Sequence, residues 1–320
     1  MSGESKSGVD IAHAGASLYK ERASSVKPRI ADTFAEAFDM RAARVIITAQ
    51  TPGWARTAAQ SMTGFATSVI GCKVEAGIEA DLLPEDTPDG RPGVSVLLFA
   101  FDAAGLGQRL VDRVGQSVLT CPTTACFDGL PDAAERVVVG GLLRHFGDKY
   151  QSSKFLDGQR YWRIPVMEGE FLVQESFGVQ AAIGGGNLLI LARDHAAALE
   201  AAEAASAVMR NVRGVILPFP GGVVRSGSKV GAKHYKKMIA STNDAYCPTL
   251  RGRGDVVSAL PDEVNAVLEI VVDGLDRSSI ERALRAGIEA ASRPGVVEIS
   301  AGNYGGKLGK HHFHLQKLAS

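Results

Sequence analysis

The segments VSVLLFAFD (residues 94–102) and AVLEIVVDG (residues 266–274) decide the fold, because they occupy equivalent places in the two halves of the chain. Each is a short run of aliphatic and β-branched residues, as expected of a buried strand. A stretch with helical periodicity follows each run: QRLVDRVGQSVL (residues 108–119) in the first half and SSIERALRAGIEAAS (residues 278–292) in the second. The chain therefore repeats a strand–helix unit.

Each half contains another strand–helix unit, which comes before the one just described. In the first half, the strand VIITA (residues 45–49) leads to the helix ARTAAQSM (55–62), and Glu36 to Phe38 lie before that strand. In the second, LLILA (188–192) leads to AAALEAAEAASAVM (196–209). Two such units per half predict an α+β protein, a duplication of two ferredoxin-like (split βαβ) lobes, each an antiparallel sheet with helices on one face.

The predicted domains follow from this repeat. Residues 1–28 are rich in Ser, Gly, Lys and Ala and form an N-terminal extension, residues 29–165 the first lobe and residues 166–320 the second, with the last strand free to return to the first lobe. The alternative is one doubly wound parallel sheet. Long proline-rich loops such as LLPEDTPDGRPG (82–93) disfavour it.

Composition excludes several classes of function. Lys plus Arg and Asp plus Glu number 35 each, so no field of one sign attracts nucleic acid or an anionic membrane. We expect a cytoplasmic protein, because the N-terminus lacks a signal-peptide pattern and no stretch approaches the roughly 20 apolar residues of a membrane span. The four cysteines form no C-x-x-C pair and are interpreted as reduced thiols.

Three motifs are set aside. The triplet Gly184 to Gly186 precedes the strand LLILA, so it predicts a turn or close backbone packing rather than a dinucleotide site. GVVRSGSK (222–229) misses the P-loop pattern by one serine; Lys229 is either a cation offered to an anionic substrate group or a solvated lysine on a mobile loop. HHFH (311–314) alternates like a strand and lacks ligands at metal-binding spacing, so no metal site is predicted.

Two polar loops are candidates for substrate binding. LTCPTTACFDGLP (119–131) and IASTNDAYCPTLRG (239–252) both place hydroxyl or amide side chains beside a Cys-Pro pair, which stiffens the backbone. Ordinary turns use the same residues, so both interpretations stay open. The candidate residues in these loops are Pro122, Thr123, Thr124, Ser241, Thr242 and Asn243.

Several strings together resemble the formylmethanofuran:tetrahydromethanopterin formyltransferase family from about residue 30 to the C-terminus. They are ADTFAEAF (31–38), TGFATSVI (63–70), TPDGRPGV (87–94), FPGGVV (219–224), ASTNDAYCPT (240–249) and ISAGNYGGKLG (299–309). The resemblance implies two ferredoxin-like lobes, an oligomer without a prosthetic group, and N-to-N formyl transfer between tetrahydromethanopterin and methanofuran. Lys229, from the Gly/Ser loop described above, and Asn303, within ISAGNYGGKLG, complete the predicted substrate-binding residues.

The resemblance also implies a catalytic carboxylate just before the motif VDGL, which is Glu269. Glu269 is the only charge in AVLEIVV, and its same-face neighbours Val267 and Val271 are apolar. Its counterpart in the first half is Leu97 or Leu98. Such surroundings raise the pKa of a carboxyl, so a protonated Glu269 could stabilise a tetrahedral intermediate or shuttle a proton. Alternatively, Glu269 faces solvent on an edge strand or pairs with an arginine.

The mechanism expected is direct transfer. No Ser, His and Asp constellation at recognisable spacing suggests a covalent formyl intermediate on the enzyme. Transfer within a ternary complex is the simpler mechanism, in which the enzyme mainly orients its two substrates.

Two departures from methanogen members, the extra residues before Ile30 and the neutral charge, make the chain resemble the bacterial methylotroph branch. There the counterpart is a subunit of a formyltransferase/hydrolase complex, running from formyltetrahydromethanopterin to a methanofuran analogue, from which a sister subunit releases formate. The alternative is a non-catalytic scaffold subunit that holds a carrier or a partner. A nucleotide-dependent ligase or kinase is disfavoured because a phosphate-binding loop is missing.

Overall fold

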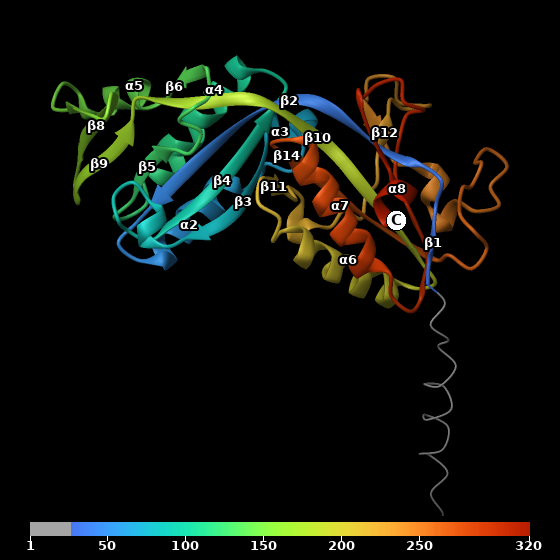
Figure 1. Ribbon diagram of the computed structural model, residues 1–320. Helices are drawn as coiled ribbons and strands as arrows, with labels where there is room; N and C mark the ends of the chain where they lie inside the picture. The colour runs from blue at the N-terminus through green and yellow to red at the C-terminus, as the bar shows by residue number, and fades with distance from the viewer. Residues whose placement is uncertain (1–26) are drawn as a thin grey trace, which may run out of the picture.

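The computed structural model describes residues 27–320 (Figure 1). The first lobe is an antiparallel sheet in the order β5-β2-β4-β3, with helices α2 and α4 packed on one face. This places the fourth strand beside the first and the third beside the second, which is the split βαβ arrangement. Its elements are β2 (Phe34–Thr48), α2 (Pro52–Thr63), β3 (Glu75–Leu82), β4 (Gly93–Ala100), α4 (Ala103–Arg113) and β5 (Ala125–Asp128).

The second lobe repeats the same topology. Its sheet has the antiparallel order β15-β10-β14-β11, with α6 and α7 on one face. The elements are β10 (Ser176–Ala192), α6 (His195–Met209), β11 (Val215–Ile216), β14 (Ala266–Gly274), α7 (Arg277–Ala291) and β15 (Val296–Ser300). The predicted α+β duplication is therefore confirmed.

Aspartates at the strand ends set where three of the helices begin. Asp102, Asp194 and Asp276 each accept a hydrogen bond from the backbone N–H three residues on, at 2.7, 2.9 and 2.7 Å. This N-cap satisfies one of the backbone donors that a helix leaves free at its start. The prediction that the helix after β4 begins at Gln108 was wrong, because Asp102 caps it at Ala103 and α4 ends at Arg113.

The first strand of each lobe is longer than predicted and continues into the other lobe. β2 begins at Phe34, so Glu36 to Phe38 lie within it, and β10 begins at Ser176 rather than near Leu188. The glycines at 184–186 are thus inside a strand; a bulge with Gly185 at φ +83° interrupts the pairing there. A Cβ on Gly184 would clash with Met40, so the predicted close packing is confirmed.

Exchange of strand ends joins the two lobes. The start of β2 places Ala35 and Ala37 in the core of the second lobe, and the start of β10 places Phe177 and Val179 in the core of the first. The two strands pair with each other in between, from Gln180–Ala42 to Gly184–Phe38. A third apolar cluster, on the face away from the helices, fills the space between the lobes and includes Leu97, Phe99 and Ile216.

The remaining elements extend this frame. In the first lobe they are α3 (Val69–Cys72), β6 (Glu135–Val138), α5 (Gly140–Leu143), β7 (Ser152–Leu156), β8 (Gln159–Val166) and β9 (Gly169–Gln174), the last pairing parallel to β5. In the second they are β12 (Lys229–Val230), β13 (Ala240–Ser241), β16 (His311–His314) and α8 (Leu315–Ala319). β16, the predicted HHFH strand, pairs with the start of β2.

The chain enters the fold at β1 (Arg29–Ile30), which runs parallel to β15. Of the extension predicted for residues 1–28, residues 1–26 lie outside the described part. The four cysteines are free thiols, with Cys126 buried and the others half-buried. Within residues 27–320, every helix is too short or too polar to span a bilayer.

Candidate functional site

A polar cavity of about 350 Å³ opens on the face of the second sheet that the helices leave uncovered. Along β14, Ile270 and Val272 pack under the helices. Alternation along a strand therefore turns Glu269, Val271 and Asp273 to the opposite face, and Glu269 and Val271 line the cavity. On the equivalent face of the first lobe lies Leu97, one of the two predicted counterparts of Glu269, within the apolar cluster between the lobes.

Glu269 is held by its backbone while its carboxyl is unpaired. In the sheet, Glu269 pairs with Leu189 of β10. On the other side, its backbone exchanges two hydrogen bonds with Val224, at 2.7 and 2.9 Å. Among residues 27–320, no hydrogen bond or ion pair reaches the half-buried Glu269 carboxyl. Burial raises its pKa to about 7. The alternatives of an exposed edge position and of an arginine partner do not describe this site.

Three predicted residues share the cavity with Glu269: Lys229, Asn243 and Asn303. Lys229 is held rather than solvated, because its ammonium group pairs with Asp244, to which Lys233 also donates at 3.0 Å. The bonds from Lys229 and Lys233 lower the pKa of Asp244 to about 2. Ser241 pairs with Lys229 across the β12–β13 hairpin, and Thr242 contacts Cys247 at 3.6 Å. These two residues support the cavity wall.

Pro122, Thr123 and Thr124 lie elsewhere, at a cavity of about 320 Å³ in the first lobe, to which Thr123 and Thr124 contribute. Ala125 pairs with Thr48 at the end of β2, whereas Glu36, near its start, lines the Glu269 cavity. At about 3.3 Å per residue, the strand separates the two places by roughly 40 Å. Within one chain, the two proline-stiffened loops therefore do not meet.

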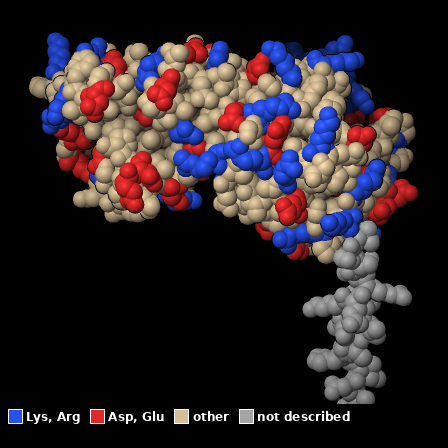
Figure 2. Space-filling model, in the orientation of Figure 1, with Lys and Arg blue, Asp and Glu red and all other residues tan. Residues whose placement is uncertain are grey.

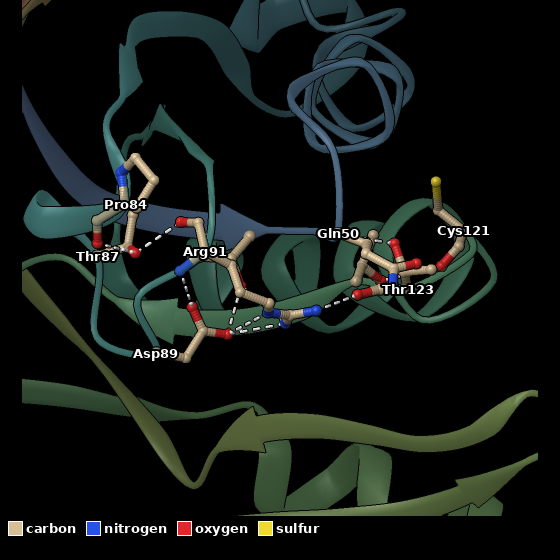
Figure 3. Close-up of polar contacts among 9 residues, drawn as sticks. Gln50, Pro84, Thr87, Asp89, Arg91, Cys121 and Thr123 are labelled. Carbon is tan, nitrogen blue, oxygen red and sulfur yellow. Dashed lines mark hydrogen bonds and ion pairs between the residues drawn. The ribbon is translucent and has the colours of Figure 1, made fainter.

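The polar groups of the first-lobe cavity bind one another. Thr123, in the left-handed region at φ +65°, donates its N–H to Glu168 at 2.9 Å and accepts the N–H of Gln50 at 3.0 Å. Arg91 donates to the Thr123 carbonyl at 2.6 Å and to Asp89 at 2.8 Å (Figure 3). The Thr124 hydroxyl donates to the Val118 carbonyl at 2.6 Å. This network fixes the loop.

Glu36, which the sequence analysis did not select, organises the loop at 303–309. Its buried carboxylate accepts four backbone N–H groups, from Tyr304, Gly306, Leu308 and Gly309, at 2.6 to 3.0 Å. Burial alone would raise the pKa of Glu36, but these bonds, led by that from Gly309, lower it. The only available signal was that Glu36 is the single charge in TFAEAF (33–38), between Asp32 and Asp39.

The loop that Glu36 organises carries two cavity residues. Asn303 donates to the Thr33 hydroxyl and the Phe34 carbonyl, at 3.0 and 3.1 Å, so its amide is fixed. The Tyr304 ring lies 6.5 Å from that of Phe38. Burial, and then the charges of Glu269 and Glu36, raise the pKa of the Tyr304 phenol, which therefore remains a hydrogen-bond donor.

A pair of buried acidic residues, Glu75 and Asp273, lies beside Glu269. Asp273, on the same strand face as Glu269, accepts the N–H of Gly185 at 2.8 Å, and Glu75 accepts that of Val69 at 2.9 Å. The two carboxyls face each other across the lobes, and burial raises the pKa of both. Two buried carboxylates in contact repel, so this pair shares a proton. It anchors the β10 bulge that forms one wall of the cavity.

The site can perform acid–base chemistry on a small molecule. A carboxyl with a pKa of about 7 is present in both protonation states at neutral pH, which suits proton transfer. Fixed amides and a phenol surround it. Among residues 27–320, no group of three or more His, Cys, Asp or Glu side chains is placed to hold a metal ion. The fold and the site together are those expected of an enzyme built from two ferredoxin-like lobes, with an unpaired acid in a polar cavity.

Comparison with known proteins names the family. The model of formylmethanofuran-tetrahydromethanopterin formyltransferase matches residues 24–166, and that of its proximal lobe matches residues 169–318. The chain belongs to this family. It is 58% identical over 293 residues to formylmethanofuran–tetrahydromethanopterin formyltransferase of Methylococcus capsulatus, which covers 90% of the chain and 97% of that protein.

The chain is also similar to a protein of Methylorubrum extorquens, both in sequence and in structure. One subunit of the formyltransferase/hydrolase complex of this organism is 54% identical over 300 residues, covering 91% of the chain and 95% of that protein. A chain in the crystal structure of the formyltransferase/hydrolase complex with methylofuran superposes with a TM-score of 0.88 at 52% identity, covering 92% of this chain and 99% of that one. The similarity extends over nearly all described residues.

Proposed function

We propose that this enzyme transfers a formyl group between tetrahydromethanopterin and a methanofuran-type amine, with Glu269 as the group that moves the proton. The activity is that of the family to which the chain belongs. The observation that carries the role of Glu269 is its unpaired carboxyl, with a pKa raised to about 7, in a cavity of fixed polar groups.

The proposed reaction needs one proton donor and one acceptor. The acceptor nitrogen bonds to the formyl carbon while the carbonyl π electrons move to oxygen, which gives a tetrahedral intermediate. The carbon–nitrogen bond to the donor then breaks, and the departing nitrogen takes up a proton. Protonated Glu269 supplies that proton and regains the one that the acceptor nitrogen loses. No net proton is consumed.

Direct transfer in a ternary complex is supported by the position of Glu269 between two hollows. Its side chain lines the main cavity and also a smaller one of about 50 Å³, bounded by Val224, Arg225 and Val267. Two carriers approaching from these sides would meet at this carboxyl, as a transfer without a covalent enzyme intermediate requires. Lys229, Asn243 and Asn303 are positioned to contact them.

We further place the enzyme in the cytoplasm, as a homo-oligomer that assembles with other subunits of a formyltransferase/hydrolase complex. Similarity to the complex subunit of Methylorubrum extorquens supports the assembly with other subunits. In that setting the reaction runs from formyltetrahydromethanopterin toward the formylated furan carrier and formate. A scaffold subunit that only holds a carrier is the alternative, and the unpaired Glu269 favours catalysis.

The test is the Glu269→Gln variant, which keeps the shape of the side chain but cannot exchange a proton. Formyl exchange between the two carriers, followed by absorbance, should fall by about 10²- to 10⁴-fold. Glu263→Gln, an exposed glutamate just before β14, is the matched control and should retain activity. A scaffold subunit would show no exchange in the unmutated protein, even with the partner subunits supplied.

A further inference from the structure

A groove larger than the Glu269 cavity lies between the lobes. Its volume is about 760 Å³, against about 350 Å³ for the cavity. One wall comes from α2 and β3 of the first lobe, and the other from the segment between the end of α6 and Gly221. Figure 2 shows this region as the notch between the two lobes, with Lys and Arg side chains gathered along its upper edge.

The arginines that line the groove carry more positive charge than its acidic residues balance. Arg56 forms two bonds with Asp81, at 2.6 and 2.7 Å, so that pair is neutral. Within residues 27–320, Arg210 has no ion pair, and Arg213 approaches only Glu79, at 3.8 Å. Any ligand for the groove therefore meets the guanidinium group of Arg210, and that of Arg213, whose acidic partner Glu79 is shared with Arg44.

Glu79 neutralises Arg213 only in part, because its carboxylate also pairs with Arg44. It accepts two bonds from Arg44, at 2.7 and 2.8 Å, one from Ser95 at 2.6 Å and one from the N–H of Gly214 at 2.8 Å. The last bond crosses from the first lobe to the second. It fixes the backbone directly after Arg213, so the guanidinium projects from a held turn rather than a free loop.

The groove adjoins the Glu269 cavity. Phe219 lines both, and the adjacent residues Thr67 and Ser68 line the groove and the cavity respectively. Phe65, 84% exposed, adds an aromatic face on the groove side. A long molecule with one end at Glu269 would reach the two arginines by way of Phe219, which lines both hollows.

We infer that the groove binds the anionic end of one carrier, a phosphate or carboxylate group, while the formyl-bearing end of the same carrier lies at Glu269. This inference rests on the proposed function. Guanidinium forks match the oxygens of phosphate and carboxylate, and an unpaired Arg210 beside a partly neutralised Arg213 favours an anion. The arginines then determine which carrier is accepted and leave the proton chemistry to Glu269.

The test combines kinetics with direct binding to the full chain, using the double variant Arg210→Ala/Arg213→Ala. The KM of one carrier should rise about tenfold or more while kcat changes little, because charge-assisted bonds are lost away from the reacting atoms. The Arg210→Lys/Arg213→Lys variant should recover part of the loss. Arg285→Ala, an exposed arginine of α7 outside the groove, is the control.

Calorimetric titration with inorganic phosphate and with glutarate distinguishes the two anion sources and does not depend on turnover. Binding of at least one probe, lost in the double alanine variant and kept in Arg285→Ala, supports the inference even if transfer itself is absent. Unchanged binding of both probes and an unchanged KM for both carriers overturn it. A lowered melting temperature alone would then mean that the arginines only stabilise the C-terminal end of α6.

Discussion

The first-lobe cavity at Thr123 and the second-lobe cavity at Glu269 have nearly the same volume, about 320 and 350 Å³, yet differ in how their polar groups are used. At Thr123, each donor and acceptor named above binds a neighbour in the same loop system. At Glu269, fixed groups surround a carboxyl that has no hydrogen-bond or ion-pair partner among residues 27–320. An unpaired acid, rather than a fully hydrogen-bonded polar loop, is therefore where we propose that the reaction takes place.

The largest effect on stability is expected when the hydrogen-bond network around Thr123 is broken. Arg91→Ala removes the donor to Asp89, Thr48 and the Thr123 carbonyl. Unpaired acceptors left behind should lower the free energy of unfolding by about 3 kcal/mol, measured with urea. Formyl transfer by the folded fraction should stay within about twofold, provided that the network is structural. A large fall in kcat with intact stability would instead place Thr123 in the active site.

A smaller effect is expected on the frame of the Glu269 cavity. Glu36→Gln turns an amide N–H₂ toward backbone donors that now bind the carboxylate, costing about 2 kcal/mol of unfolding free energy. Because the folded pKa of Glu36 is lowered, its stabilisation is present above the unfolded pKa and is lost as the pH falls through the folded value. The unfolding free energy of the variant should therefore fall less on acidification.

Kinetics of Glu36→Gln separate positioning from mere stability. Since the loop carries Asn303 and Tyr304, KM should rise more than kcat falls, and Glu36→Asp should recover part of the loss. Equal losses in the Gln and Asp variants, with KM unchanged, would contradict a positioning role.

The smallest effect concerns the shared proton of Glu75 and Asp273. Burial raises the pKa of both, so the native pair holds a proton that the unfolded chain releases above roughly pH 4. Stability of the unmutated protein should fall as the pH rises from there. Asp273→Asn removes this dependence and should be more stable by about 1 kcal/mol at pH 8. Urea unfolding at pH 6 and pH 8 makes the measurement; a destabilised variant at pH 8 would refute the shared proton.

The repeated strand–helix units made the fold predictable from the sequence. The lengths of the strands could not be predicted in the same way. Runs such as LLILA and VIITA signal strands through β-branched and aliphatic side chains. The stretch AAIGGG of β10 carries no such signal, and it is a strand because Met40 and Phe38 of β2 lie against its glycines. Tertiary packing therefore extended both long strands beyond their predicted starts.

The site was predictable in part for a related reason. Glu269 stands out locally as one charge in an apolar strand. The role of Glu36 depends on N–H donors almost 270 residues away, which local patterns do not reveal. The separation of Pro122, Thr123 and Thr124 from Asn243 depends on how the lobes join. Their substrate contacts remain predictions.

The pH dependence of kcat, at saturating concentrations of both carriers, tests the central claim most directly. If protonated Glu269 supplies the proton to the departing nitrogen, kcat should fall about tenfold per pH unit above an apparent pKa of about 7. This fall of kcat at high pH should persist in Glu263→Gln and should be absent from the residual activity of Glu269→Gln. A profile that is flat through neutral pH, or one that Glu269→Gln leaves unchanged, would contradict the role assigned to Glu269.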